Sequence, residues 1–248
     1  MKENKSNENH ENLRKRTSHV RKLFSRVPKT YEKINHILTF GFDIKWRKSL
    51  VRIALKSDSG NWIDMCTGTG ETAVYLSRSS PKGTKIFAVD LTPEMLQHAK
   101  TKPEAKDIEF TCADIKSLPF ADNYFDLITM TFATRNINLN KNILIKSFSE
   151  FQRVLKPGGF FINLETSQPD NSLIRRIFHL YINLLVKLVG TGISGSKPAY
   201  SYLAHTIPKF YTTEELSGIL QESGFSKISF RKLLFGIAAI HKCYKLKK

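Results

Sequence analysis

The stretch Asn61-Trp-Ile-Asp-Met-Cys-Thr-Gly-Thr-Gly-Glu-Thr-Ala73 decides the fold that we predict for this chain. Its apolar start, Trp62–Met65, is typical of a strand buried in a parallel sheet. Gly68 and Gly70 then permit a tight turn and a close approach of the backbone to a ligand. A helical run begins at Thr72, so its free N–H groups point back at the turn. The pattern predicts a strand, a ligand-binding turn and a helix in succession.

A second apolar run, Ile86–Val89, is followed by Asp90, about twenty residues after Gly70. In nucleotide-binding α/β folds, an acid at this spacing accepts hydrogen bonds from ribose hydroxyls. The pattern Gly68-x-Gly70-x-x-Ala73 also fits the dinucleotide fingerprint, which permits Ala at its third place. By themselves these features predict a nucleotide-like ligand without choosing among such ligands.

Strand and helix patterns alternate through the middle of the chain. The expected strands cover residues 62–65, 85–89, 108–112, 125–131 and 160–165. A helical pattern over Lys141–Leu155 ends at Lys156-Pro-Gly-Gly159, a typical helix stop. This alternation predicts an α/β fold, Rossmann-like and doubly wound, with a mostly parallel sheet. Two strand-like runs, Ser226–Leu234 and Ile237–Tyr244, predict an antiparallel hairpin on one side of it.

The predicted domain organisation has three parts. Residues 1–20 are rich in Lys, Glu, Asn and Arg, which predicts a disordered tail. Residues 21–55 show helical apolar spacing interrupted by a turn at Thr39–Asp43, which predicts two helices. These helices form either a lid over the ligand or a cover for the sheet edge. Residues 56–248 form the nucleotide-binding type of domain, with a helical insertion at about 172–210.

The charge of the chain is strongly unbalanced, with 39 Lys and Arg against 22 Asp and Glu and a net charge of +17. Such an excess indicates a polyanionic partner or an acidic lipid surface, or serves solubility alone. Three scattered cysteines (Cys66, Cys112 and Cys243) fit a reducing compartment, and we find no Cys/His pattern that predicts a metal site. The polar N-terminus is no secretory signal, and no apolar run is long enough to span a bilayer.

Four further features lie at the ends of the predicted strands. Asp64, within the first strand, could accept hydrogen bonds from the turn or from a ligand ammonium group. Ala113-Asp114 follows the third strand, where a carboxylate could accept from an adenine amino group. Asp122-Asn-Tyr-Phe-Asp126 leads into the fourth strand, and Arg153-Val-Leu-Lys-Pro-Gly-Gly159 into the fifth. Together these features resemble the class I S-adenosylmethionine-dependent methyltransferases, whose seven-stranded sheet has one antiparallel strand.

Two longer signatures narrow the resemblance. Tyr31-Glu-Lys-Ile-Asn35 followed by Thr39-Phe-Gly-Phe-Asp-Ile-Lys-Trp46 resembles the N-terminal signature of the quinone C-methyltransferases of menaquinone and ubiquinone biosynthesis. Arg153-Val-Leu-Lys-Pro-Gly-Gly-Phe-Phe-Ile-Asn-Leu-Glu-Thr-Ser167 resembles a second signature of that family. Shorter matches are Arg135-Asn136, Tyr202-Leu-Ala-His-Thr-Ile207 and Ala239-Ile-His241. Asp43 departs from the pattern, because the family usually has His there.

This resemblance implies S-adenosylmethionine as the cofactor. It implies cofactor contacts at Thr69, Asp90, Asp114, Ile115 and Thr131. The residue pattern adds Asp64, Gly68, Gly70 and Leu91 to the expected cofactor-binding set. Carboxylates suit this ligand, because ribose hydroxyls, an adenine amino group and an ammonium group are all hydrogen-bond donors.

The acceptor implied by the resemblance is a prenylated quinol, expected to be a demethylmenaquinol, with a ubiquinone precursor as an alternative. A ring carbon becomes nucleophilic when an adjacent hydroxyl loses its proton, so a base or a cation near that oxygen helps. Arg135 is the first candidate for this cation, with Asn136 as its hydrogen-bond partner. Tyr31 and His241 are candidates for acceptor contact or proton relay. Candidate acceptor-binding residues are Tyr202 and Trp46.

The apolar run Ser172–Val189 predicts a helix that lies either in the core or against a membrane. It carries Arg175, Arg176 and Lys187, and the segment Lys227–Lys248 has Lys and Arg but no acid. These charges favour peripheral contact with the inner face of a membrane by a cytoplasmic protein. The oligomeric state stays open, with a homo-oligomer as one possibility.

Two rival functions remain at this point. The net charge of +17 is compatible with an RNA methyltransferase on the same core, although no RNA-binding appendage is recognisable and a nucleic-acid partner is not expected. The other rival is a membrane-associated scaffold that binds S-adenosylmethionine without catalysis. The intact glycine turn and Asp90 disfavour the scaffold.

Overall fold

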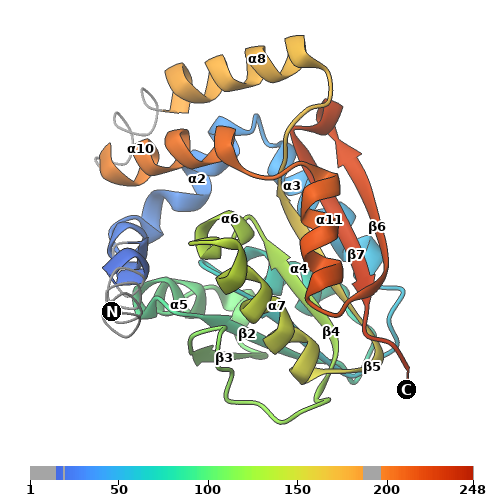
Figure 1. Ribbon diagram of the computed structural model, residues 1–248. Coiled ribbons are helices and arrows are strands. Elements are labelled where there is room, and N and C mark those ends of the chain that lie inside the picture. The colour runs from blue at the N-terminus through green and yellow to red at the C-terminus, as the bar shows by residue number, and fades with distance from the viewer. Residues whose placement is uncertain (1–14, 19, 187–196, 248) are drawn as a thin grey trace, which may run out of the picture.

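The computed structural model describes residues 15–18, 20–186 and 197–247. In this part of the chain seven strands form one sheet, in the order β3-β2-β1-β4-β5-β7-β6 (Figure 1). The strands are β1 (Asn61–Met65), β2 (Lys85–Asp90), β3 (Ile108–Cys112), β4 (Phe125–Thr131), β5 (Leu155–Thr166), β6 (Ser226–Leu233) and β7 (Ala238–Tyr244).

The strand directions confirm the predicted fold class. β1 pairs in parallel with both β2 and β4, while β3 and β5 extend the sheet in parallel on either side. β7 runs antiparallel to both of its neighbours, β5 and β6, so it is the one reversed strand and forms the expected terminal hairpin. The strand order reverses beside β1, and ligands of open α/β sheets bind at the carboxyl ends of strands at such a point.

Alternate residues of the central strands pack into two separate hydrophobic clusters, one on each face of the sheet. Ile63 and Met65 face a cluster that is rich in phenylalanine and includes Phe148 and Phe161. Trp62 faces the opposite cluster, which includes Leu127. Because both faces are buried, β1 and β4 are nearly continuous apolar runs rather than alternating ones.

Helices cover both faces of the sheet. The helices outside the insertion are α2 (Pro28–Leu38), α3 (Phe42–Ala54), α4 (Glu71–Ser79), α5 (Pro93–Lys100), α6 (Thr134–Ile137), α7 (Lys141–Val154) and α11 (Thr213–Glu222). Short 3₁₀ turns are η1 (Pro103–Ala105), η3 (Ile207–Lys209) and η4 (Leu234–Gly236). α7 begins where the Asn140 side chain caps the Ile143 N–H, and α11 begins with a capping box between Thr212 and Glu215. Hydrogen bonds of capping side chains therefore explain where α7 and α11 begin.

The segment Lys156-Pro-Gly-Gly159 differs from its prediction. It does stop α7, but it belongs to β5, which starts at Leu155 rather than at Phe160. A register shift between Phe125 and Leu127 on the neighbouring strand accommodates the additional residues. The Gly158 N–H donates to the Lys245 carbonyl, and the Gly159 carbonyl accepts from the Lys245 N–H. The segment thus forms strand pairs that its composition did not suggest.

The segment predicted as a helical insertion is helical over most of its described residues. It contains α8 (Ser172–Tyr181), a π-helical turn η2 (Ile182–Val186) and α10 (Lys197–Thr206), which gather above α2 in Figure 1. A third apolar cluster joins α2 to these helices. Residues 187–189 of the predicted run, including Lys187, lie outside the described residues.

The N-terminal tail is described only in part. Of the segment 1–20 for which we predicted disorder, residues 1–14 and 19 lie outside the described residues. Residues 15–18 and 20–24 are helical, so helical structure extends into the last residues of the predicted tail. Within the described ranges, no helix is both long and apolar enough to cross a bilayer.

Candidate functional site

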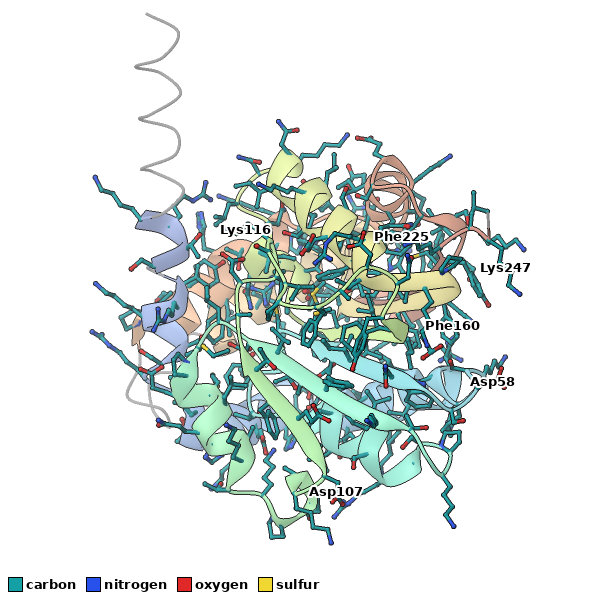
Figure 2. All side chains as sticks on the ribbon, turned by 90° about the horizontal axis from the view of Figure 1, so that it is seen from below. Asp58, Asp107, Lys116, Phe160, Phe225 and Lys247 are labelled. Carbon is teal, nitrogen blue, oxygen red and sulfur yellow. The ribbon has the colours of Figure 1, made fainter. Side chains whose placement is uncertain are left out.

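A polar cavity lies at the carboxyl ends of the parallel strands. Asp64 on β1, Asp90 at the end of β2, Asp114 after β3 and Thr131 at the end of β4 all line it. In Figure 2, Lys116, just beyond β3, lies toward the upper left, whereas Asp58, which precedes β1, lies at the right edge and Asp107, which precedes β3, lies at the bottom. We refer to this cavity as the donor cavity. The parallel topology brings together side chains that are far apart in sequence.

Asp64 is buried at the base of the donor cavity. One carboxylate oxygen accepts from the Thr67 hydroxyl at 2.7 Å and the other accepts from the Thr129 hydroxyl at 2.7 Å. Burial raises the pKa of Asp64 to about 6, opposed by these two hydrogen bonds. The predicted contact of Asp64 with the turn is confirmed, and its contact with a ligand ammonium group stays a prediction.

The glycine turn is held against β2. The Gly68 N–H donates to Asp90 Oδ2 at 2.9 Å, and Gly68 has a φ of +56°. Gly70, at φ +79°, begins α4, and a Cβ there would lie 3.0 Å from the Cβ of Ala99. Gly70 therefore serves the turn and the helix packing, and it is not among the residues that line the donor cavity.

Asp90 and Asp114 keep lone pairs that their present partners do not use. Asp90 accepts one N–H on each oxygen, from Gly68 and from Thr92 at 2.8 Å. Asp114 accepts the Lys116 N–H at 3.0 Å and pairs with the Lys116 ammonium at 3.2 Å. Because each carboxylate oxygen can accept more than one hydrogen bond, both side chains can still bind donors of a ligand.

The donor cavity has a negative electrostatic character near the turn. The carboxylates of its wall are Asp64, Glu71, Asp90 and Asp114. Burial, together with the negative charges of Asp90, Asp64 and Asp114, raises the pKa of the Cys66 thiol well above its usual value. The carboxylates around Cys66 favour the positively charged part of a ligand, and Arg47 on the same wall can accommodate a single anionic group but not a whole pyrophosphate. The geometry therefore narrows the ligand class that the glycine turn alone left open.

A second cavity, of about 350 Å³ and mainly apolar, adjoins the donor cavity. Its wall comes largely from α2, α3 and α8, and it shares Tyr31, Arg47 and Phe132 with the donor cavity. Trp46 lines it and packs near Phe132, with their ring centroids 6.1 Å apart. We refer to it as the apolar cavity. Two ligands could thus meet at the shared wall.

The comparisons with known proteins agree on one family. The model of the ubiE/COQ5 methyltransferase family matches residues 10–245. The demethylmenaquinone methyltransferase of Thermus thermophilus is 35% identical over 221 residues, which cover 88% of this chain and 98% of that protein. That of Thermotoga maritima is 35% identical over 91% of this chain and 96% of its own length. The chain belongs to the ubiE/COQ5 methyltransferase family.

A further relative supports the same family, and a solved structure shows the same fold. The ubiquinone/menaquinone biosynthesis C-methyltransferase of Desulfotalea psychrophila is 31% identical over 90% of this chain and 88% of its length. A solved SAM-dependent methyltransferase from Thermotoga maritima aligns with a TM-score of 0.66 at 17% identity, covering 92% of this chain and all (100%) of that one. This structural likeness shows the fold. As a family member the chain is a methyltransferase, and the scaffold alternative is set aside.

S-adenosylmethionine, the methyl donor of this methyltransferase, fits the residues present. Its positively charged sulfonium suits a cavity walled by carboxylates. Asp64 is within reach of the turn, and Asp90 and Asp114 retain acceptor capacity for ribose and adenine donors. Of the nine predicted cofactor residues, the eight other than Gly70 line the donor cavity: Asp64, Gly68, Thr69, Asp90, Leu91, Asp114, Ile115 and Thr131.

The residues predicted to act on the acceptor are only partly brought together. Tyr31, Trp46 and Arg135 line the apolar cavity, and Asn136 lines the donor cavity. Burial raises the pKa of Tyr31, opposed by the hydrogen bond to Asn35 and by the charges of Arg135 and Arg47. Tyr31 therefore stays protonated at neutral pH and can donate a hydrogen bond.

Tyr202 and His241 lie elsewhere. Tyr202 lines a third cavity, which shares Arg135 with the apolar one. His241 lines none of these three cavities, since its Nε2 lies 3.0 Å from the Thr213 carbonyl under α11. Burial lowers the pKa of His241, opposed by that hydrogen bond. The suggestion of a proton relay through His241 is not supported by this placement, because β7 turns the imidazole toward α11.

Sequence reasoning missed Arg47 and Phe132. Both lie on the wall between the two cavities, with the guanidinium carbon of Arg47 5.4 Å from the Phe132 ring centroid. A signal for Arg47 was available, because the buried positions of α3 recur at helical spacing: Asp43, Trp46, Arg47, Leu50, Val51 and Ala54. A charged residue on an otherwise largely apolar helix face indicates a specific partner. Phe132, directly after β4, carried no comparable signal.

Atoms that could bind a metal ion lie within 4.8 Å of one another in a group formed by His36, Asp43 and Glu71. The sequence predicts no metal site. His36 uses Nδ1 toward Asp43 at 2.7 Å and Nε2 toward Glu71 at 3.4 Å. Because both ring nitrogens face a carboxylate, we interpret the group as a chain of polar contacts that continues from Glu71 to Arg47. It links α2 and α3 to the start of α4.

Proposed function

We propose that this methyltransferase transfers a methyl group from S-adenosylmethionine to a ring carbon of a prenylated quinol, a demethylmenaquinol. The observation that carries the proposal is the shared wall between a carboxylate-lined cavity and an apolar one. Relatives named demethylmenaquinone methyltransferase cover most of this chain. The apolar cavity supplies a site for the ring and the first part of a prenyl chain.

The donor is held by the strand ends. Asp90 accepts from the ribose hydroxyls, Asp114 accepts from adenine, and Asp64 faces the ammonium group. Thr69, Leu91 and Ile115 supply backbone and apolar contacts around the nucleoside, and Thr131 closes the cavity at the end of β4. Bound in this way, S-adenosylmethionine supplies an electrophilic methyl group that needs alignment rather than further activation.

The acceptor is prepared by Arg135, which is buried beside the apolar cavity. Its Nη1 donates to the Thr206 hydroxyl at 2.8 Å and to Asn136 Oδ1 at 3.2 Å. Within the described part of the chain, its buried Nε has no hydrogen-bond partner. Because Arg135 lines the apolar cavity, its guanidinium can stabilise a phenolate oxygen of the quinol, which makes the adjacent ring carbon nucleophilic. Asn136 and Thr206 hold it in place.

The apolar cavity opens among exposed apolar side chains. Phe40, Ile177 and Leu234 line it and are all exposed, Phe40 by 76%. The same face of α8 and η2 exposes Leu173, Leu180 and Leu184, near Arg175 and Arg176. Apolar side chains flanked by Arg suit a bilayer surface with anionic headgroups. A peripheral contact at this face would give a prenylated acceptor a direct path from the membrane into the cavity.

The test uses purified protein, S-adenosylmethionine with a labelled methyl group, and a demethylmenaquinol kept reduced in phospholipid vesicles. The expected result is a labelled quinone heavier than the substrate by one methyl group, identified by mass spectrometry. Transfer of the label to RNA, with none to the quinol, would contradict the proposal.

Quinone profiling in cells gives an independent measurement. Cells that lack the chain should accumulate a quinone lighter by one methyl group, and restoring the chain should reverse this. A complementing chain with Arg135→Gln is the matched control, because it keeps the donor cavity while removing the proposed cation. An unchanged quinone pool in cells without the chain would overturn the assigned acceptor.

A further inference from the structure

Arg47 is a buried cation whose function is still unassigned. It lies on α3, is only 6% exposed, and lines both the donor cavity and the apolar cavity. Burying a guanidinium costs free energy unless partners compensate it. The partners of Arg47 are therefore informative about what the side chain is there to bind.

The contacts of Arg47 leave part of its guanidinium available. Nη1 donates to the Thr72 hydroxyl at 2.7 Å, and Nη2 lies 3.4 Å from Glu71 Oε2. Glu71 is shared, since its other oxygen faces His36 at 3.4 Å. Among the described residues, the buried Nε of Arg47 has no hydrogen-bond partner. The guanidinium thus has donor capacity that these partners do not use, and Arg47 lines both cavities.

Arg47 lies at the Asp64 end of the donor cavity rather than at the Asp114 end. Its partner Thr72 is in the first turn of α4, directly after the glycine turn, and the Thr72 hydroxyl donates to the Thr131 hydroxyl at 3.1 Å. The N-terminus of α4 adds a partial positive charge at the same place. Two independent features, the guanidinium and the helix end, therefore favour an anion beside the turn.

The other cations of the donor cavity are placed differently. Arg21 is exposed, and Lys116 is paired with Asp114 at 3.2 Å. Among the described residues that line the cavity, Arg47 is therefore the buried cation. The amino-acid end of S-adenosylmethionine carries an ammonium group and a carboxylate on one carbon. A carboxylate such as Asp64 suits the first group, and a buried cation close to it suits the second.

We propose that Arg47 binds the carboxylate of the methyl donor and so fixes the amino-acid end beside the glycine turn. This inference rests on the proposed function, which places the donor in this cavity. Glu71 acts as a positioning residue, because it orients the guanidinium from the side of α4. The His36–Asp43 contact supports Glu71 in turn.

The experiment compares two ligands by isothermal titration calorimetry with the full chain. S-adenosylhomocysteine has the carboxylate, and 5′-methylthioadenosine lacks the whole amino-acid end. Arg47→Gln should weaken S-adenosylhomocysteine binding by roughly 10- to 100-fold, the range for a charge-assisted hydrogen bond. The same variant should bind 5′-methylthioadenosine as the unmodified chain does, which also shows that the variant is folded.

Two control variants test whether the effect depends on the charge at Arg47 in particular. Arg47→Lys should recover part of the lost affinity, because it restores the charge without the planar donor pattern. Lys116→Gln removes a cation from the Asp114 end and should leave the ratio of the two affinities unchanged. Equal weakening of both ligands by Arg47→Gln, or of neither, overturns the proposal for Arg47.

The failure of this inference can be told apart from failure of the proposed function. If the unmodified chain binds S-adenosylhomocysteine and Arg47→Gln binds it equally well, the donor cavity stands and the role of Arg47 is wrong. If Arg47→Gln leaves donor binding intact but raises KM for the quinol, Arg47 contacts the acceptor, which also overturns the proposal. If the unmodified chain binds neither nucleoside, the proposed function itself fails.

Discussion

The two cavities of this methyltransferase are built in different ways. The donor cavity is formed largely by strand ends, and backbone N–H groups or hydroxyls hold its carboxylates: Gly68 and Thr92 hold Asp90, while Thr67 and Thr129 hold Asp64. The apolar cavity is formed largely by side chains of helices packed over the sheet. The first site depends on the positions of individual atoms, and the second depends on shape and apolar surface.

This difference predicts how each cavity responds to substitution. When a carboxylate of the donor cavity is replaced, a defined hydrogen bond to the ligand is lost, and the affinity for the donor falls. A site defined by shape tolerates many apolar exchanges, so the largest effects there come from its few polar groups. Arg135 is such a group, whereas Asp90 and Asp64 test the donor cavity.

The largest effect is expected at Arg135. Arg135→Gln should lower kcat roughly 1,000-fold, because a preorganised cation stabilises charge that develops during the reaction. Arg135→Lys should retain part of the activity, since it keeps the charge. Binding of S-adenosylhomocysteine, measured by calorimetry, should be unchanged in both variants. A parallel loss of donor affinity would mean that the two cavities are not as separate as we describe them.

Asp90→Ala should weaken S-adenosylhomocysteine binding about 100-fold, because two ribose hydroxyls lose their acceptor and two backbone N–H groups lose theirs. Calorimetry measures this change. The matched control is Asp122→Ala, an exposed carboxylate paired with Arg153 outside the cavity, which should bind the donor normally. Unchanged affinity in Asp90→Ala would show that the assigned donor pose is wrong.

Asp64 provides a pH test of the donor cavity. Its pKa is raised to about 6, so its ionised form dominates above that pH and its neutral form below it. If the ionised form binds the ammonium group, S-adenosylhomocysteine affinity should fall about tenfold from pH 7 to pH 5. Asp64→Asn should remove this part of the pH dependence. A pH profile that is identical in the variant would show that Asp64 does not contact the ligand charge.

The smallest effect concerns the exposed apolar face of α8, beside the apolar cavity. Replacing Leu173 and Leu180 together by Glu should reduce binding to vesicles with anionic lipid about fivefold, because apolar contact with the membrane is lost. Cosedimentation measures it. The control is Leu55→Glu, also an exposed Leu but located directly after α3. Equal loss in both variants would argue that general charge, rather than this face, governs membrane binding.

Much of the donor cavity could be predicted from the sequence. The glycine turn, Asp90, Asp114 and Thr131 each follow or end an apolar run, and parallel strands bring such positions to one edge of a sheet. The strand bounds at 108–112 and 125–131 were also correct. The boundary before β5 was wrong at Lys156–Gly159, because pairing with Lys245, far away in sequence, overrides the local preference of Pro and Gly for turns.

The surroundings of Arg135 and His241 could not be predicted from the sequence in the same way. The contact between Arg135 and Thr206 joins residues 71 positions apart on two different helices, which no local pattern encodes. The placement of His241 could not be predicted, because its orientation depends on which face of β7 it occupies, and Ala239 and Ile240 beside it are both buried and apolar. When apolar and polar residues do not alternate along a strand, the sequence does not show which face of the sheet each residue occupies.

The sequence by itself therefore determined the family, the α/β fold and most of the carboxylates that line the donor cavity, because these depend on short patterns repeated at strand ends. Only the tertiary structure decided that Arg47 and Phe132 form the wall between two cavities, and that His241 faces α11. The physical reason is that helix packing places these side chains through contacts between distant segments. The turn at Asn61–Ala73 forms part of the donor cavity, while the packing of α2, α3 and α8 shapes the apolar cavity.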